Sequence, residues 1–210
     1  MSIMQLDNVS YTYDRNARSV LNGVTYDFDK GKCYAIVGSS GAGKTTMLNL
    51  LAGLDAPSSG VVRFDGKDVA ATGYSMHRKK QVSLVFQNYN LIDYLTPLEN
   101  LRLVNRKASV QDLEQLGIDA AAAQRSVLKL SGGQQQRVAI GRALVSSAPV
   151  ILADEPTGSL DGDTAQAVID ILRGAAHEHD KCVIVVTHSN QLAKAADITL
   201  RLERRKLVQN

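Results

Sequence analysis

Nine consecutive residues, 38–46, read GSSGAGKTT and have the types that bind a phosphate group. In the pattern GxxxxGK[ST], backbone N–H groups of a glycine-rich loop and of the following helix N-terminus point at the phosphate. Lys44 adds a cation for the β and γ phosphates, and the hydroxyl of Thr45 is a ligand for Mg²⁺. A glycine-rich turn with an incidental lysine is the alternative. The expected phosphate-binding residues are Gly38, Ser39, Ser40, Gly41, Ala42, Gly43, Lys44, Thr45 and Thr46.

Two adjacent carboxylates, Asp154 and Glu155, end the apolar segment 150–153. If this segment is a strand of a parallel sheet, both acids lie at its carboxyl end, where such sheets bind ligands. Asp154 would then hold Mg²⁺ through water, and Glu155 would act as general base on a water that attacks the γ phosphate. A helix N-cap followed by a loop acid is the alternative. Beside a phosphate loop, the metal and base interpretation is favoured.

A second helix start follows the string LSGGQ at residues 130–134. Ser131 is placed as the N-cap of the helix that follows. Gly132 and Gly133, which precede Gln134, leave backbone N–H groups uncovered at the positive end of the helix dipole. The chain therefore has two anion-binding helix starts, one more than a single bound nucleotide needs.

Apolar strands alternating with helices surround these motifs. Residues 33–37 have the length of a buried strand, and apolar residues at helical spacing follow the phosphate loop as far as Gly53. A further helix is expected over 163–173, with Gly174 ending it. Further core strands are expected at 82–86, 150–153, 183–187 and 198–202. This alternation predicts an α/β fold with a parallel, doubly wound core sheet.

Two segments depart from that alternation. Antiparallel strands with one wet side are expected over 3–28 and 61–64. Residues 88–130 have no strong strand signal and contain an alanine run, which indicates a helical insertion. We therefore expect a single nucleotide-binding domain, with a core at 1–87 and 131–210 and the insertion at about 88–130.

The composition fits one soluble domain of 210 residues, 44% hydrophobic and 21% charged, with a formal net charge of +3. No apolar run approaches the roughly 18 residues of a membrane span, and residues 1–5 lack the pattern of a signal peptide. Cys33 and Cys182 are expected to be buried thiols, and the small charge indicates no nucleic-acid partner. His177 and His179 are expected to be exposed polar residues. These features predict a cytoplasmic chain.

In their order along the chain, the phosphate loop, the LSGGQ string and the two acids resemble the ATP-binding cassette (ABC) ATPases, the nucleotide-binding domains of ABC transporters. This P-loop NTPase resemblance covers essentially the whole chain. Other P-loop classes lack LSGGQ, and the guanine-binding NKxD motif of small GTPases is not found in the sequence. The resemblance implies an ATPase that uses ATP and Mg²⁺.

The resemblance also implies roles for aromatic and polar residues outside these motifs. Tyr13 resembles the aromatic that stacks on adenine, with Tyr11 as its competitor. Gln87 resembles the glutamine of the Q-loop, which contacts Mg²⁺ beside Thr45 and Asp154. His188 resembles the switch histidine at the γ phosphate. The implied catalytic set is Glu155, His188 and Gln87.

In the family, two copies pair head to tail, and Ser131, Gly132, Gly133 and Gln134 of one copy complete the ATP site of the other. Ser159, Leu160 and Asp161 resemble the D-loop at that interface, although asparagine is frequent at the position of Ser159. The implied partner is thus a second copy of the chain.

A membrane permease is the second implied partner, because the chain has no span of its own. It is expected to dock near residues 88–97, which places the chain peripherally on the inner face of the cell membrane. Residues 86–91 and 153–161 are similar to the lipoprotein-release, macrolide-export, antimicrobial-peptide-resistance and cell-division group. A soluble ABC ATPase of translation or DNA repair is the alternative, although such proteins carry two cassettes or a long coiled coil.

Overall fold

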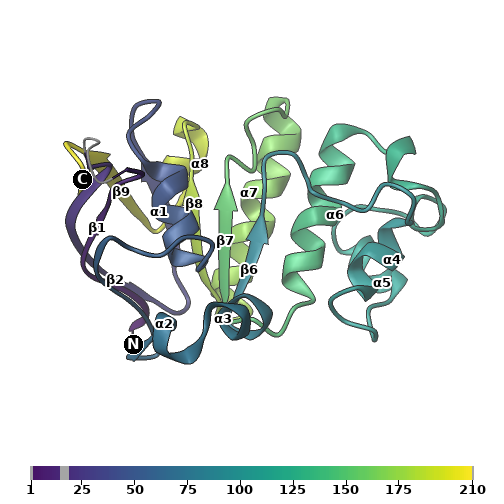
Figure 1. Ribbon diagram of the computed structural model, residues 1–210. Helices are drawn as coiled ribbons and strands as arrows, with labels where there is room; N and C mark the ends of the chain where they lie inside the picture. Colours follow the sequence, from purple (N-terminus) through teal and green to yellow (C-terminus); the bar gives the residue numbers. More distant parts are fainter. Residues whose placement is uncertain (1, 15–18, 210) are drawn as a thin grey trace.

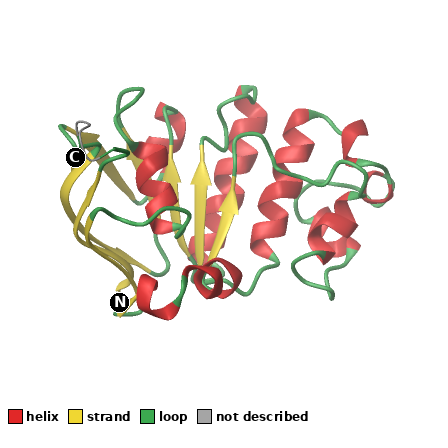
Figure 2. Cartoon of the chain, viewed as in Figure 1, coloured by secondary structure: helices red, strands yellow, loops and turns green. Residues whose placement is uncertain are grey.

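The computed structural model describes residues 2–14 and 19–209, which fold into two sheets and the helices around them (Figure 1 and Figure 2). The larger sheet has six strands in the order β10-β9-β3-β8-β7-β6. The adjacent strands β9, β3, β8, β7 and β6 are all parallel to one another. The edge strand β10 pairs antiparallel with β9. The strands are β3 (Cys33–Val37), β6 (Val82–Val85), β7 (Val150–Asp154), β8 (Cys182–Val186), β9 (Ile198–Glu203) and β10 (Lys206–Gln209). The predicted α/β class with a parallel core sheet is confirmed.

Helices cover both faces of this sheet, which explains why its central strands are apolar at nearly every position. β8 is buried along its whole length. Ile184 belongs to the apolar cluster that includes α1 (Lys44–Leu51), whereas the next residue, Val185, belongs to the cluster that includes α7 (Gly162–His177). Successive side chains of a strand point to opposite faces. The doubly wound arrangement therefore follows from two apolar faces that both need cover.

Parallel strands bring their carboxyl ends to one edge of the sheet, and four such ends carry predicted site residues. β3 leads into the phosphate loop, β6 into Gln87, β7 into Glu155 and β8 into His188. The strand register aligns the ends of β7 and β8, because their last residues, Asp154 and Val186, lie opposite each other. Segments far apart in sequence thus meet at one place.

A second sheet lies beside the first, with the strand order β2-β1-β4-β5 and antiparallel pairs throughout. Phe28 of this sheet packs edge-on against Tyr34 of β3, with ring centroids 5.1 Å apart. The predicted antiparallel layer is confirmed, and it shares an apolar core with the parallel sheet. Its strands are β1 (Ser2–Tyr11), β2 (Leu21–Asp29), β4 (Ser59–Phe64) and β5 (Lys67–Asp68), and α2 (Val69–Thr72) and α3 (Tyr74–Lys80) follow.

Between β6 and α6 (Gly132–Leu144) the chain folds into short helices. Leu101, Leu113 and Ile118 form an apolar cluster of their own, which also takes in Val138 of α6. The elements are α4 (Pro97–Arg102), α5 (Val110–Glu114), η1 (Ala122–Gln124) and η2 (Val127–Lys129). The domain limits stay a prediction, and Met1, residues 15–18 and Asn210 lie outside the described residues.

One helix end differs from the prediction. The expected stop at Gly174 is wrong, because α7 continues to His177. A glycine inside a helix costs about 1 kcal/mol relative to alanine. Ala175 and Ala176 are buried in the apolar cluster against the sheet, and this burial offsets the cost. The bounds of β6, β7 and β8 each differ from the predicted ones by one residue.

The last helix is α8 (Asn190–Ala195), which follows β8. Among the residues that the structure describes, no helix combines the length and the apolar character needed to cross a bilayer. The longest of them, α7, has 16 residues.

Candidate nucleotide site

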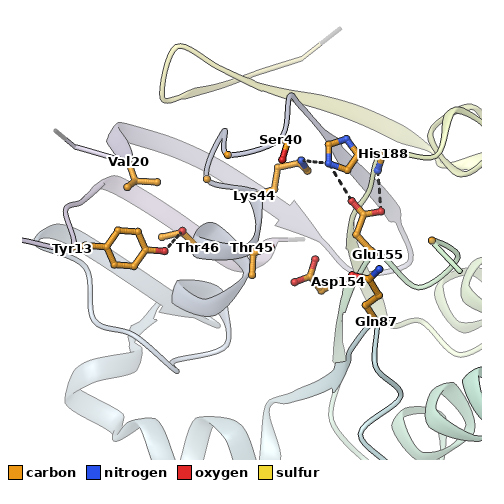
Figure 3. A pocket seen from close by; sticks show the side chains of 13 residues that line it. Tyr13, Val20, Ser40, Lys44, Thr45, Thr46, Gln87, Asp154, Glu155 and His188 are labelled. Atoms are coloured by element: carbon orange, nitrogen blue, oxygen red, sulfur yellow. Dashed lines mark hydrogen bonds and ion pairs between the residues drawn. The ribbon is translucent and has the colours of Figure 1, made fainter. Parts of the chain in front are cut away.

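A cavity of about 580 Å³ lies at the carboxyl edge of the parallel sheet. This volume is in the range of about 300–1,000 Å³ that small-molecule sites occupy. Figure 3 shows side chains that line it, drawn from all four strand ends and from the loop that carries Tyr13. The lining residues are Tyr13, Val20, Ser40, Gly41, Gly43, Lys44, Thr45, Thr46, Gln87, Asp154, Glu155, Gly158 and His188.

The phosphate loop reaches this cavity through Gly43, which is the N-cap of α1. Gly43 has a φ of 101°, a left-handed conformation that side chains disfavour. A Cβ built there would lie 2.6 Å from Cγ1 of Val20, so only glycine fits. As a glycine, this N-cap residue has no side chain with which to cap α1. The first turn of α1 therefore presents its backbone N–H groups to the cavity.

Lys44 is 7% exposed, and its ammonium group holds the loop in place. Nζ donates hydrogen bonds to the carbonyl oxygens of Gly38 at 3.0 Å and Ser39 at 3.3 Å. Gly38, Ser39 and Ala42 do not line the cavity but border the adjacent one, of about 650 Å³. Six of the nine predicted loop residues thus face the cavity, and two of the others fold the loop around Lys44.

His188 stands between a cation and an anion at the cavity edge (Figure 3). Its Nε2 lies 3.0 Å from Nζ of Lys44 and 3.6 Å from Oε1 of Glu155. Nε2 of His188 therefore lies within reach of both charged groups.

The backbone of Glu155 is held in an unusual conformation, with a φ of 45°. Left-handed non-glycine residues are uncommon and cluster at functional sites. The N–H of Glu155 donates to the carbonyl oxygen of Val186 at 2.9 Å. Its carboxylate Oε2 accepts from the N–H of His188 at 3.0 Å and from the hydroxyl of Thr187 at 3.2 Å. The end of β7 is therefore fastened to the end of β8.

Asp154 faces the first turn of α1. Burial raises the pKa of its carboxyl above the ordinary value, although a side-chain hydrogen bond with Thr45 acts in the opposite direction. Gln87 lines the same cavity from the end of β6. The three predicted metal ligands therefore meet, and all offer oxygen atoms.

Tyr13 lines the cavity and Tyr11 does not. The Tyr13 ring is 69% exposed, and its hydroxyl shares a 2.7 Å hydrogen bond with Oγ1 of Thr46 in α1. Tyr11 packs edge-on against Tyr13, with ring centroids 5.1 Å apart. Tyr13 is thus the ring that faces the cavity, and Tyr11 packs against it from behind.

The LSGGQ segment does not line this cavity. Ser131 caps α6 as predicted, since its Oγ accepts from the N–H of Gln134 at 3.3 Å and its own N–H donates to Oε1 of Gln134 at 3.0 Å. A Cβ on Gly133 would lie 2.3 Å from Cγ2 of Thr164, so α6 begins in direct contact with α7. Ser131 and Gly132 are exposed.

The segment 159–161 joins Glu155 to α7. Asp161 caps α7, and hydrogen bonds from the N–H and hydroxyl of Thr164 lower the pKa of its carboxyl. Ser159 is exposed, with its Oγ 3.5 Å from the hydroxyl of Tyr89, whereas Leu160 packs against the apolar cluster under α7. Two of the three predicted D-loop residues thus point outward.

Val20 and Gly158 line the cavity, and the sequence motifs did not predict them. Gly158 had a signal, because it follows the two acids in the loop after β7. Val20 had none in its spacing. Its role appears only in three dimensions, where its Cγ1 fills the space that a side chain on Gly43 would need.

Comparisons with known proteins all point to the same protein family. Residues 21–158 match the family described as ABC transporter. The uncharacterized ABC transporter ATP-binding protein YclH of Bacillus subtilis is 44% identical, over 97% of this chain and 95% of its own. The lipoprotein-releasing system ATP-binding protein LolD of Pseudomonas syringae pv. tomato is 36% identical, over 99% and 98%.

A solved structure agrees with these relatives. The ATP-binding cassette MJ0796 of Methanocaldococcus jannaschii, in a dimeric post-hydrolysis state bound to ADP and Pi, superposes with a TM-score of 0.87. It is 33% identical, over 99% of this chain and 98% of that one. The chain belongs to the ABC transporter family, as an ATP-binding and ATP-hydrolysing subunit with a P-loop NTPase fold. The predicted similarity to the lipoprotein-release group is confirmed.

Proposed function

We propose that the chain is the Mg²⁺-dependent ATPase subunit of a membrane transport complex, and that ATP-dependent pairing of two copies drives a separate permease. One observation carries the proposal. A buried cation, two carboxylates and a histidine, from α1 and the ends of β7 and β8, line one cavity of nucleotide size. Charge of both signs at one end of the phosphate loop suits both binding and hydrolysis of a phosphoanhydride.

The donor set fits a magnesium ion. Thr45 and Asp154 share a hydrogen bond, so a hydroxyl and a carboxylate oxygen already lie together, with Gln87 lining the same cavity. Mg²⁺ prefers oxygen ligands and keeps several waters. Thr45, Asp154 and Gln87 would hold the ion, in part through water. When bound, it neutralises charge on the β and γ oxygens.

The nucleotide is held along the length of the cavity. Lys44, Thr46 and the N–H groups of the α1 first turn bind the phosphates, and the exposed face of Tyr13 stacks on the adenine. Glu155 accepts a proton from the attacking water as general base, while His188 contacts the γ phosphate from the side of Lys44. These roles are supported by the 3.0 Å and 3.6 Å distances that link Lys44, His188 and Glu155.

A second copy of the chain completes the site. The N-terminus of α6 lies outside the cavity, with Ser131 and Gly132 exposed, and residues Ser131, Gly132, Gly133 and Gln134 would bind the γ phosphate held by the partner copy. The exposed residues of the 159–161 segment would meet their counterparts across the interface. ATP thereby bridges two copies, and hydrolysis releases them.

The permease would dock beside residues 88–97. Tyr94 in this segment is 86% exposed, whereas Leu91 packs against the apolar cluster of the short helices. A groove of about 470 Å³ has Leu103, Val104 and Arg142 in its lining, and Arg142 donates to the carbonyl oxygen of Asn90 in this segment at 2.8 Å. An amphipathic helix of a membrane protein fits such a groove. The chain would thus sit in the cytoplasm on the inner face of the cell membrane, with no nucleic-acid partner.

The test is purification of a tagged copy from membranes in mild detergent, followed by an ATPase assay with and without a chelator. We expect an integral membrane protein to copurify, and hydrolysis to stop when Mg²⁺ is removed. Recovery from cytosol with ribosomes or DNA would instead support a soluble ABC ATPase of translation or DNA repair.

A further inference from the structure

We infer that Thr187 is a positioning residue for Glu155, and that it fixes which carboxylate oxygen faces the nucleotide. The inference rests on the base role proposed above for Glu155. Thr187 follows the last residue of β8 and is 0% exposed. Its N–H donates to the carbonyl oxygen of Ile36 at 3.0 Å, which extends the pairing of β8 with β3 by one residue. The side chain therefore starts from a rigid strand rather than from a mobile loop.

The hydroxyl of Thr187 has a defined direction. The N–H of Ser189 donates to Oγ1 of Thr187 at 2.9 Å, so this oxygen is already an acceptor. The single hydroxyl hydrogen is then donated to Oε2 of Glu155, 3.2 Å away. Oε2 also accepts from the N–H of His188 at 3.0 Å. Two hydrogen bonds, from the hydroxyl of Thr187 and from the N–H of His188, thus meet on one oxygen of the carboxylate.

This arrangement leaves the other oxygen, Oε1, for chemistry. Oε1 lies 3.6 Å from Nε2 of His188, which lines the cavity with Glu155. The main chain of Glu155 is held as well, because its N–H donates to Val186 at 2.9 Å. With the backbone and Oε2 both fastened to β8, the plane of the carboxylate is set. Oε1 is the oxygen that accepts the proton from the attacking water.

Orientation of this kind affects the chemical step more than it affects binding. A displacement of about 1 Å in a catalytic group can cost about a hundredfold in rate. Thr187 is not among the residues that line the cavity, so its hydroxyl has no direct part in holding ATP. A purely structural role would instead lower the amount of folded protein and leave turnover per folded molecule unchanged.

The experiment compares Thr187→Val with Thr187→Ser, which keeps the hydroxyl, and with Thr199→Val. Thr199 is a suitable control because it is a strand threonine whose hydroxyl donates to the carbonyl oxygen of Ala193 at 2.7 Å, away from the cavity. We expect kcat per folded molecule to fall at least about tenfold in Thr187→Val, with the dissociation constant for ATP changed less than about twofold. Thr187→Ser should recover most of the rate, and Thr199→Val should match the unmodified protein.

The Glu155→Gln background separates this inference from the base role itself. If Thr187 acts through Glu155, adding Thr187→Val to Glu155→Gln should change the residual turnover less than about twofold. An equal loss in both backgrounds would overturn the inference and leave the base role standing. Near-normal turnover of Glu155→Gln alone would instead overturn the base role.

Two further results bear on the inference alone. Unchanged kcat per folded molecule in Thr187→Val would overturn it. Should that variant not fold, Thr187→Ala compared with Thr187→Ser gives the same contrast of hydroxyl against none, with the same expected outcome.

Discussion

The N-termini of α1 and α6 use the same backbone chemistry in opposite surroundings. α1 has no side-chain cap and opens into a walled cavity that contains Lys44 and two carboxylates. α6 is capped by its own Ser131 and Gln134 and begins on the exposed surface, outside that cavity. Both helix ends carry the positive end of a dipole. The α1 end has no cap of its own and faces the cavity, whereas the α6 end is capped within its own chain.

This difference explains why one chain has two such helix starts. An uncapped helix end leaves its N–H groups free for water or a ligand, whereas a capped end satisfies some of them within the chain. The comparison therefore supports two half-sites, and substitutions at each end should separate binding from pairing.

The largest effect is expected at the hydrolytic side of the α1 cavity. Glu155→Gln keeps the size of the side chain and one acceptor oxygen for Thr187 and His188, but it removes the base. Turnover should fall by about a hundredfold or more, while ATP still binds. Single-turnover hydrolysis of radiolabelled ATP measures this directly. Near-normal turnover would remove Glu155 from the base role.

The next effect is expected in nucleotide affinity. Lys44→Ala removes the cation of the α1 cavity, so affinity for ATP should weaken about tenfold to a hundredfold, as expected for a lost charge-assisted hydrogen bond. Calorimetry measures the change. Because Lys44 also holds Gly38 and Ser39, thermal unfolding is the control for loop damage. Unchanged affinity would contradict the assignment of the phosphate loop.

The α6 end should behave differently from the α1 end. Ser131→Asp keeps an N-cap and suits the helix dipole, yet it places a negative charge where a partner's γ phosphate would bind. ATP affinity of the isolated chain should stay within about twofold, while turnover falls about tenfold or more. Ser131→Asn is the matched control, since it caps equally well without the charge. Equal turnover of the two variants would contradict the proposal that the α6 end binds the partner's γ phosphate.

The smallest effect is expected at the opposite edge of the sheet. Asp197 accepts hydrogen bonds from the N–H of Cys33 and from His177, and although burial acts to raise its pKa, these contacts lower it below the ordinary value. A depressed folded-state pKa stabilises the fold above the unfolded pKa of about 3.9, and the contribution is lost as pH falls through the folded value.

Asp197→Asn should therefore lower the free energy of unfolding by less than about 1 kcal/mol at pH 6, because the pair with His177 is partly exposed. The difference from the unmodified protein should shrink at acidic pH, as urea titrations at several pH values can show. Turnover should not change, since both residues lie outside the cavity. A loss of turnover would show that this edge communicates with the site.

The fold could be predicted wherever the sequence carries a local signal. Buried strands such as β8 read as unbroken apolar runs because both faces are covered. The prediction that the helix ends at Gly174 was wrong because it used only the low helix propensity of glycine. Burial of Ala175 and Ala176 against the sheet, which is a tertiary effect, extends the helix. His177 is exposed, as predicted. Its hydrogen bond to Asp197 could not be predicted, because the two residues are 20 positions apart and belong to no recognisable motif.

The site shows the same division. Sequence motifs identified Lys44, Asp154 and Glu155, and the structure places all three in one cavity. They could be expected to lie together because the carboxyl ends of parallel strands share one edge of the sheet. Tyr13 and Tyr11 could not be separated by sequence, since both are aromatic residues of one short segment. Only the fold shows which ring lines the cavity and which supports it. Val20 was missed because steric exclusion at Gly43 depends on a neighbour that is distant in sequence and lies just before β2.

Light scattering tests the central claim, that the cavity is half of a site, most directly. In the Glu155→Gln background, addition of ATP and Mg²⁺ should double the molecular mass of the purified chain. The same protein with Ser131→Asp added should bind ATP equally well and keep the mass of one copy. A chain that stays monomeric at saturating ATP, or one that pairs regardless of Ser131, would contradict the account.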